Sequence, residues 1–152
     1  MAEPETKPPP ITAYVLICDR VLNEGDSILS AIRISDHFTS NAPPEAPGDD
    51  IVINLQVLSA AKFALEDQHG HSLQLQLIRP NGESKLLHEP SEVALAPKVA
   101  GFPRGLQMIS VIGIKLTQPG LHFFALMCDG VECCRTPFML RRQTTESKEP
   151  KG

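Results

Sequence analysis

The stretch HSLQLQLIRPNGE, residues 71–83, decides the fold, because apolar and polar side chains alternate along it. Leu73, Leu75 and Leu77 fall on one face of an extended chain, and the two intervening glutamines fall on the other. This period of two is typical of a β-strand with one face toward a core. Pro-Asn-Gly at positions 80–82 then predicts a turn, after which the chain can return beside the first strand.

Six other segments also have the pattern of strands. Three are apolar on both faces, as expected of central strands or strands buried between layers: ITAYVLIC (11–18), LQMISVIGIKL (106–116) and GLHFFALMC (120–128). The others are SILSAIRIS (27–35), IVINLQVLS (51–59) and ECCRTPFML (132–140). Only SAAKFALEDQ (59–68) is ambiguous, between a short helix and an irregular crossing. About eight strands predict an all-β fold, a two-sheet antiparallel β-sandwich of immunoglobulin-like or C2-like type.

Composition divides the chain into three parts. Residues 1–10 are rich in proline and predict a flexible tail, and residues 143–152 are polar and predict a disordered tail. Residues 11–142 form the β-sandwich domain. A second proline-rich stretch, residues 39–50, is expected to be an exposed linker between sheets.

Charge and hydropathy exclude several classes of protein. A net charge of −4 with scattered basic residues argues against a nucleic-acid partner. The longest apolar runs are about six residues, far short of the ~20 that span a bilayer. The first residues lack the basic start and apolar run of a signal peptide. We therefore expect a soluble cytoplasmic protein whose four cysteines are free thiols.

Three cysteines gather in MCDGVECCR, residues 127–135. The Asp-Gly pair at 129–130 predicts a two-residue type I′ hairpin turn. The predicted cross-strand pairs are Cys128 with Val131, Leu126 with Cys133, and Ala125 with Cys134. In this register Cys134 points away from the other two thiols, so all three cannot bind one tetrahedral ion. We expect inert thiols that bind neither a metal nor a cofactor. Redox-sensitive thiols and metal-binding thiols are the less favoured interpretations.

Other reactive groups are dispersed. His69 and His71 could share the face of a strand, as a metal site would require, but polar neighbours favour solvated turn histidines. The aspartates lack Asp-x-Asp spacing and are expected in turns and caps rather than at calcium. No nucleophile motif or phosphate-binding glycine loop is present, so we predict no catalytic residue and no enzyme. A deep polar pocket joining His37, His69 or His71 to acidic residues would favour an enzyme instead.

The connection EPSEVALAPKVAGFPRG, residues 89–105, is the most informative irregular stretch. Long connections of this kind are often functional, and prolines would stiffen this one into a docking loop. The candidate partner-binding residues are Leu95, Lys98, Val99, Phe102 and Arg104. The alternative is a crossover that covers a sheet edge.

Three stretches carry a resemblance: AYVLICDRVLNEGDSILSAIRISDHF, LQLQLIRPNGE and QPGLHFFALMCDGVECCRTPFML. In that order they resemble an uncharacterised bacterial family of small β-sandwich proteins, catalogued only as a domain of unknown function. The resemblance covers most of residues 11–142 and implies a bacterial source and a sandwich fold. It implies no catalytic residue.

These observations favour a non-catalytic protein-interaction module of the bacterial cytoplasm. It would bind a protein partner through residues 89–105, or self-associate through an exposed sheet edge. The alternative is a sandwich that binds a small ligand or carbohydrate. Carbohydrate is disfavoured because the chain has no tryptophan and a single tyrosine, Tyr14.

Overall fold

The computed structural model describes residues 6–25, 29–40, 51–87, 91–93, 101, 104–116 and 118–142. Within these residues the regular structure consists of strands, without a helix. The ten strands are β1 (Thr12–Asn23), β2 (Leu29–Ile34), β3 (His37–Ser40), β4 (Ile51–Phe63), β5 (His71–Ile78), β6 (Ser84–Leu86), β7 (Ser91–Val93), β8 (Arg104–Leu116), β9 (Gly120–Cys128) and β10 (Val131–Arg142).

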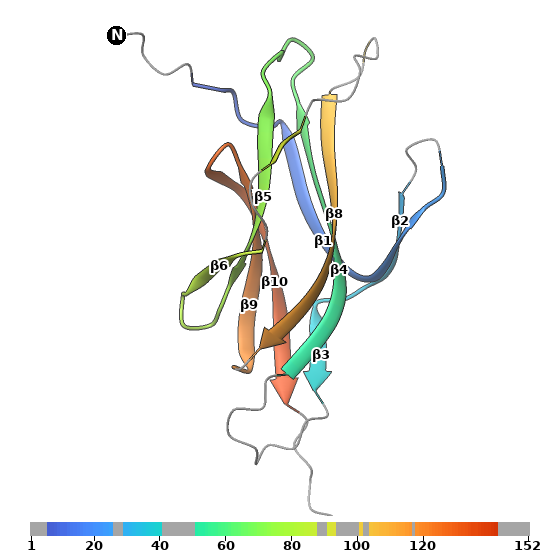
Figure 1. Cartoon of the computed structure of the whole chain (residues 1–152), viewed down its shortest axis with the longest axis vertical. Coiled ribbons are helices and arrows are strands. Elements are labelled where there is room, and N and C mark those ends of the chain that lie inside the picture. The colour runs from blue at the N-terminus through green and yellow to red at the C-terminus, as the bar shows by residue number, and fades with distance from the viewer. Residues whose placement is uncertain are drawn as a thin grey trace, which may run out of the picture.

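Two sheets face each other, which confirms the predicted β-sandwich (Figure 1). One sheet has the strand order β2-β1-β4-β8, and the other has the order β3-β10-β9-β5-β6, with β7 also paired to β5. The pairing is antiparallel except between β3 and β10, which run parallel. The two strands beyond the predicted number of about eight, β3 and β7, are short. Segments of three or four residues, such as β3, β6 and β7, are too brief to show a periodic pattern.

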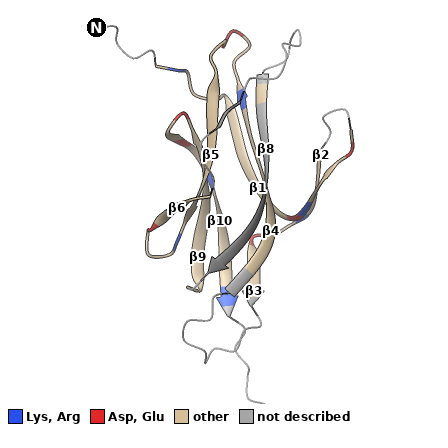
Figure 2. Cartoon of the chain, in the orientation of Figure 1, with Lys and Arg blue, Asp and Glu red and all other residues tan. Residues whose placement is uncertain are grey.

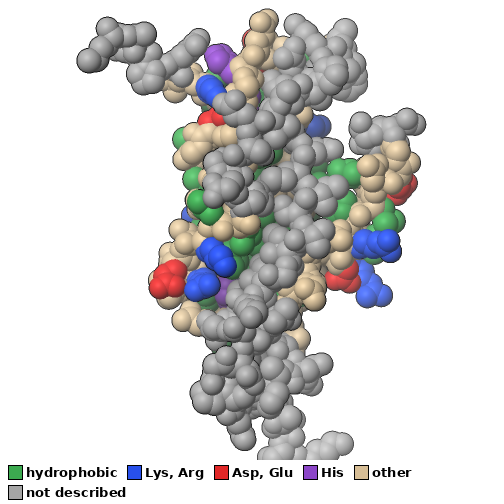
Figure 3. Space-filling view, in the orientation of Figure 1, with side chains coloured by type: hydrophobic (Ala, Val, Ile, Leu, Met, Phe, Trp, Pro, Cys, Tyr) green, Lys and Arg blue, Asp and Glu red, His purple; other side chains and the backbone are tan. Residues whose placement is uncertain are grey.

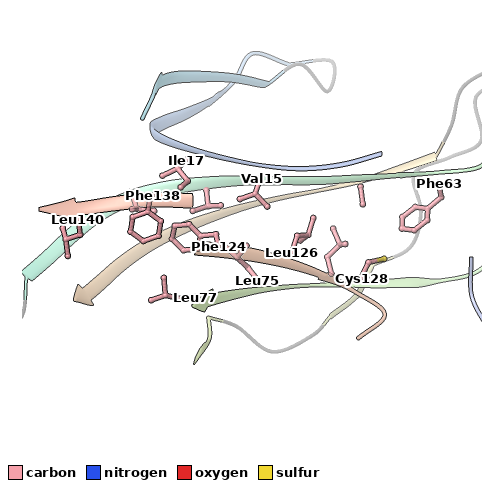
Figure 4. Close-up of a cluster of buried hydrophobic side chains, with 14 residues drawn as sticks. Val15, Ile17, Phe63, Leu75, Leu77, Phe124, Leu126, Cys128, Phe138 and Leu140 are labelled. Atoms are coloured by element: carbon pink, nitrogen blue, oxygen red, sulfur yellow. The ribbon is translucent and has the colours of Figure 1, made fainter. Parts of the chain in front are cut away.

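The alternation along β5 builds one wall of the core. Leu73, Leu75 and Leu77 are almost completely buried, whereas the glutamines between them are half-exposed. β5 pairs with β9, and the facing sheet contributes side chains of β1 and β4, so that the apolar rows meet between the layers (Figure 4). Phe63 and Cys128 lie at one end of this core and Leu140 lies at the other.

The ambiguous segment 59–68 is extended in its first half. β4 continues through Phe63, which is fully buried, and pairs with β8 as far as Arg104. A turn follows, in which the Asp67 amide donates to the carbonyl of Ala64 at 3.1 Å. The segment is therefore a strand end and a turn, because burial of Phe63 outweighs the helical preference of its alanine neighbours.

The predicted hairpin at residues 129–130 is confirmed. Asp129 and Gly130 have φ angles of 51° and 81°, the pair of positive values that a type I′ turn requires. Cys128 pairs with Val131 as expected. Two of the predicted pairs are wrong, because a β-bulge between Glu132 and Cys134 shifts the register.

The bulge inserts one residue into β10, so that Cys134 rather than Cys133 lies opposite Leu126. The extra residue, Cys133, donates its thiol hydrogen to the Leu126 carbonyl at 3.2 Å. Both Cys133 and Cys134 are half-buried and pack against the core. The same shift corrects the expectation that Cys134 points to the face opposite Cys128, because Leu126, its partner, lies two residues before Cys128 on β9.

Charged residues are dispersed along the described chain, at turns and strand ends, rather than collected on one face (Figure 2). No helix in the described residues is long and apolar enough to cross a membrane. Residues 1–5, 41–50 and 143–152, which include most of the predicted tails and linker, lie outside the described residues.

Replacement of Leu75 by Ala is expected to lower the free energy of unfolding by about 2–5 kcal/mol, because the side chain is fully buried between the sheets. Chemical denaturation measures the change. Leu121 on the neighbouring β9 is 43% exposed, and Leu121→Ala should cost less than about 0.5 kcal/mol. Equal losses for the two variants would contradict the inward orientation of Leu75.

Candidate functional site

His71 opens β5 on the buried side of the strand. It shares its face with Leu73, Leu75 and Leu77, and its side chain is 0% exposed. The expectation of a solvated turn histidine is therefore wrong for His71. The signal was present in the sequence, because residue 71 continues the leucine row by two-residue steps and must point the same way.

Two carboxylates enclose the buried imidazole. Asp67, from the turn after β4, lies 2.9 Å from Nε2 through its Oδ2. Asp129, from the β9–β10 turn, lies 2.5 Å from Nδ1 through its own Oδ2. Ionised carboxylates only accept hydrogen bonds, so both contacts form together when each ring nitrogen carries a hydrogen. The centre is thus a chain of three side chains, with the imidazole of His71 between the carboxyl groups of Asp67 and Asp129.

Further contacts hold each member of this chain in place. His69 donates its backbone amide to Asp67 Oδ1 at 2.9 Å, and its Nδ1 lies 2.8 Å from the same oxygen. The Ser72 amide donates to Asp129 Oδ1 at 3.0 Å. The Phe63 ring stacks on the imidazole of His71 with 3.7 Å between ring centres and 11° between planes. The orientation of His71 is therefore set by packing on one side and by hydrogen bonds in the ring plane.

The network lowers the pKa of both carboxyl groups. Burial alone raises the pKa of Asp67, but hydrogen bonds from His69 and His71 outweigh it and hold the value at about 2. For Asp129 too, burial opposes ionisation and the bonds from His71 and Ser72 prevail, so its pKa is lowered. Both groups are ionised at neutral pH.

Cys128 lies beside this network as a thiol. Its Sγ is 3.5 Å from Asp129 Oδ2, and burial together with the charge of Asp129 raises its pKa to about 12. Burial and the neighbouring Cys134 raise the pKa of Cys133 to about 11. Burial also raises the pKa of Cys18 and Cys134. A nucleophilic role needs a thiolate, which these surroundings disfavour.

A groove of about 920 Å³ runs between residues 6–13 and the β9–β10 hairpin. Its lining includes Ser72, Cys128 and Asp129. Lys7 also lines the groove; its Nζ donates to the Gly70 carbonyl at 2.7 Å and lies 3.8 Å from Asp129 Oδ1. Residues 6–10 of the predicted tail thus lie against the end of the sandwich that holds the imidazole.

The structure describes one of the five predicted partner-binding residues. Leu95, Lys98, Val99 and Phe102 lie outside the described residues. Arg104 begins β8, where its backbone pairs with Phe63. The docking loop therefore stays a prediction.

His37 is also separate from the network. It is exposed, and its Nδ1 contacts Asp36 Oδ1 at 2.5 Å. Of the three histidines named for a polar pocket, the structure brings His69 and His71 together at one buried carboxyl group, that of Asp67.

A second surface lies on the edge strand β2, which among the described strands pairs with β1 alone. Ile32 is 40% exposed and Ile34 is 61% exposed. Between them, Arg33 has a φ of 53° and reaches Asp19 with 3.5 Å between Nη1 and Oδ2. Arg20 lies opposite Ile32 on β1 and is exposed. We call Arg20, Ile32, Arg33 and Ile34 the ribbon patch. Figure 3 shows hydrophobic and basic side chains side by side over this part of the molecule.

No protein-family model and no curated protein matches the chain. Among solved structures, the chain is similar to the Pseudomonas fluorescens alkylpurine DNA glycosylase AlkC bound to DNA containing an abasic site analog, with a TM-score of 0.43 and 11% identity. That alignment covers 84% of this chain and 30% of the glycosylase chain, so this chain spans less than a third of that protein. An immunoglobulin-like protein from Pseudomonas aeruginosa aligns with a TM-score of 0.34 and 14% identity over 84% of this chain and 97% of that chain. No activity, ligand or partner follows from likenesses this distant.

The carboxylate at Asp67 makes stability depend on pH. Its pKa lies near 2 in the folded protein, below the ordinary value of 3.8. The contribution of ionised Asp67 to the free energy of unfolding is therefore present above about pH 4 and is lost as the pH falls toward 2. Asp67→Asn should remove this contribution and cost roughly 1–3 kcal/mol at neutral pH. Denaturant midpoints measured across the acid range check this.

The matched control is Asp19→Asn, because Asp19 is half-exposed and pairs with an exposed arginine. A surface pair of this kind contributes at most about 1 kcal/mol. The loss of stability at acid pH should persist in Asp19→Asn. The same pH profile in Asp67→Asn and wild type would contradict the assignment to Asp67.

The raised pKa of all four thiols predicts slow alkylation. In the native protein at neutral pH, iodoacetamide should modify the cysteines far more slowly than after unfolding in denaturant, because the thiolate fraction is small. Mass spectrometry of time points gives the rate for each cysteine. Rapid native labelling of Cys133 or Cys134 would instead indicate a redox-sensitive surface pair.

Proposed function

We propose that the chain is a non-catalytic protein-interaction module of the bacterial cytoplasm that binds its partner through the ribbon patch. The observation that carries the proposal is the pair of exposed isoleucines on the edge strand β2, Ile32 and Ile34. Exposed apolar side chains rimmed by charge are a common feature of binding surfaces. Edge strands also offer unpaired backbone groups to a partner.

The chemistry of the patch favours a partner segment with apolar and acidic side chains. Arg33 lies between the two isoleucines and Arg20 lies opposite Ile32. Among the described contacts, Asp19 is the one acidic group that pairs with these arginines, through Arg33. A second copy aligned antiparallel about Arg33 would place two arginines opposite each other, which is unfavourable. The left-handed φ of Arg33 also interrupts the regular edge, so side chains contribute more of the contact than continuous strand addition.

The deciding experiment compares two edge variants. Partners are first isolated from the native host with tagged wild type, Ile34→Ser and Leu86→Ser. The protein that wild type retains is then purified, and its affinity for each of the three proteins is measured by calorimetric titration. Leu86 is the matched control, since it is 47% exposed on the edge strand β6 of the other sheet. We expect Ile34→Ser to weaken binding about tenfold or more, as loss of a central apolar contact does.

Equal affinity of the three proteins for the partner would overturn the proposal. So would a dimer of wild type in analytical ultracentrifugation that Ile34→Ser abolishes, because the occupant of the patch would then be a second copy. Melting temperatures of the variants show whether the fold is retained.

The groove favours a second function, the binding of a small ligand. Its volume of about 920 Å³ falls within the range of ligand sites, and its lining includes the polar residues Lys7, Ser72 and Asp129. Thermal-shift screening against metabolite mixtures would reveal a ligand, and Glu132→Gln in the groove wall should alter the shift if the ligand occupies it.

A further inference from the structure

We propose that the chain binds one divalent transition-metal ion, best matched by zinc, between His71 Nδ1, Cys128 Sγ and an oxygen of Asp129. Candidate ligand atoms of these three residues all lie within 4.8 Å of one another. Imidazole nitrogen, thiolate sulfur and carboxylate oxygen are the donors that zinc takes in proteins. This site is independent of the ribbon patch, since it draws on other residues and the other sheet.

Neighbouring strands bring the three ligands together. β5 pairs with β9 so that Leu73 lies opposite Cys128, which places the start of β5 beside the end of β9. His71 is the first residue of β5, and Asp129 follows Cys128 in the type I′ turn. The ligands therefore stand on paired strands and a tight turn rather than on a long loop, which fixes their separation.

The outer contacts resemble those of an assembled metal centre. A metal-binding histidine usually donates its second ring nitrogen to a carboxylate, and Nε2 of His71 does so to Asp67 at 2.9 Å. This leaves Nδ1 toward Cys128 and Asp129. The Ser72 amide occupies Oδ1 of Asp129, which leaves Oδ2 toward the same point. Stacking on Phe63 keeps the imidazole in that plane.

The distances allow an ion after one small movement. Two ligands about 2.0–2.3 Å from a tetrahedral ion lie roughly 3.3–3.7 Å apart, and Sγ of Cys128 is already 3.5 Å from Asp129 Oδ2. Nδ1 of His71 is 2.5 Å from Oδ2, because a shared hydrogen joins them. The ion replaces this hydrogen, and the carboxylate moves away by about 1 Å. The protons of Nδ1 and Sγ leave to solvent, while Nε2 keeps its proton for Asp67.

The donor set and its position indicate the class of ion. A thiolate selects zinc and other borderline or soft ions over magnesium and calcium, which prefer oxygen. Cys128 and Asp129 also line the groove, so the fourth coordination position faces the groove and is open to water or a small ligand. Lys7 lies 3.8 Å from Asp129 and competes with the cation for that carboxylate.

The test titrates the reduced, chelator-treated full-length chain with Co²⁺ and then with Zn²⁺ against a chromogenic competitor. We expect one ion per chain, and a cobalt–thiolate charge-transfer band with the visible bands of a tetrahedral site. Cys128→Ser should abolish the charge-transfer band and weaken zinc binding at least about 100-fold, more than the loss of an outer contact causes. Cys133→Ser and Cys134→Ser are the matched controls and should keep both properties.

Two more variants keep the result interpretable if Cys128→Ser folds poorly, which circular dichroism will show. Asp67→Asn should retain the cobalt–thiolate band but bind zinc about 10–100-fold more weakly. Lys7→Gln changes a partly exposed side chain and should bind zinc up to about fivefold more tightly, since a competing cation is gone.

Absence of stoichiometric binding in wild type would overturn the proposal. So would a charge-transfer band that survives in folded Cys128→Ser. A band lost in Cys133→Ser or Cys134→Ser would place the ion at the adjacent cysteine pair instead, and would overturn it as well.

Discussion

The side chains at alternate positions of β5 must fill the space between the two sheets, and the rest of the structure depends on this constraint. Leu73, Leu75 and Leu77 meet the apolar rows of β1, β4 and β9, so the register of the strand is strongly specified. A slip of one residue would expose the leucines and bury two glutamines. The same constraint places His71 inside the protein, where burying an imidazole without hydrogen-bonding partners would be energetically costly.

The cost of burying that imidazole explains the arrangement around it. Two carboxylates from separate turns bond to its two nitrogens, and a backbone amide bonds to each carboxylate in turn. A closed network of this kind is stable only when every member is satisfied. The β4–β5 turn and the β9–β10 turn are consequently tied to the same point, at the end of the core marked by Phe63 and Cys128 in Figure 4.

The two candidate surfaces use different physical properties of the sandwich. The ribbon patch is an edge feature, in which apolar side chains stay exposed because β2 has one neighbour within the described part of the chain. The metal site is an end feature, in which the close pairing of β5 and β9 brings reactive groups from distant parts of the sequence together. One sandwich can carry both, since the ribbon patch lies on the sheet of β1 and β2 and the metal site on the sheet of β5 and β9.

The sequence of the cysteine-rich hairpin determined its turn but not its register. Asp129 and Gly130 adopt positive φ for a local reason, so residue identity predicts the turn. The bulge at Cys133 depends on how β10 packs across the core and the sequence carries no local sign of it.

By itself, the amino-acid sequence determined the all-β class, the sandwich and most strands, because alternation is a local property that each segment displays on its own. It also contained the inward orientation of His71, which follows from the same two-residue period as the leucines. The tertiary structure alone decided that Asp67, His71 and Asp129 meet. Their contact depends on which strands are neighbours in the sheet, and that choice arises from packing over the whole core rather than from any one segment.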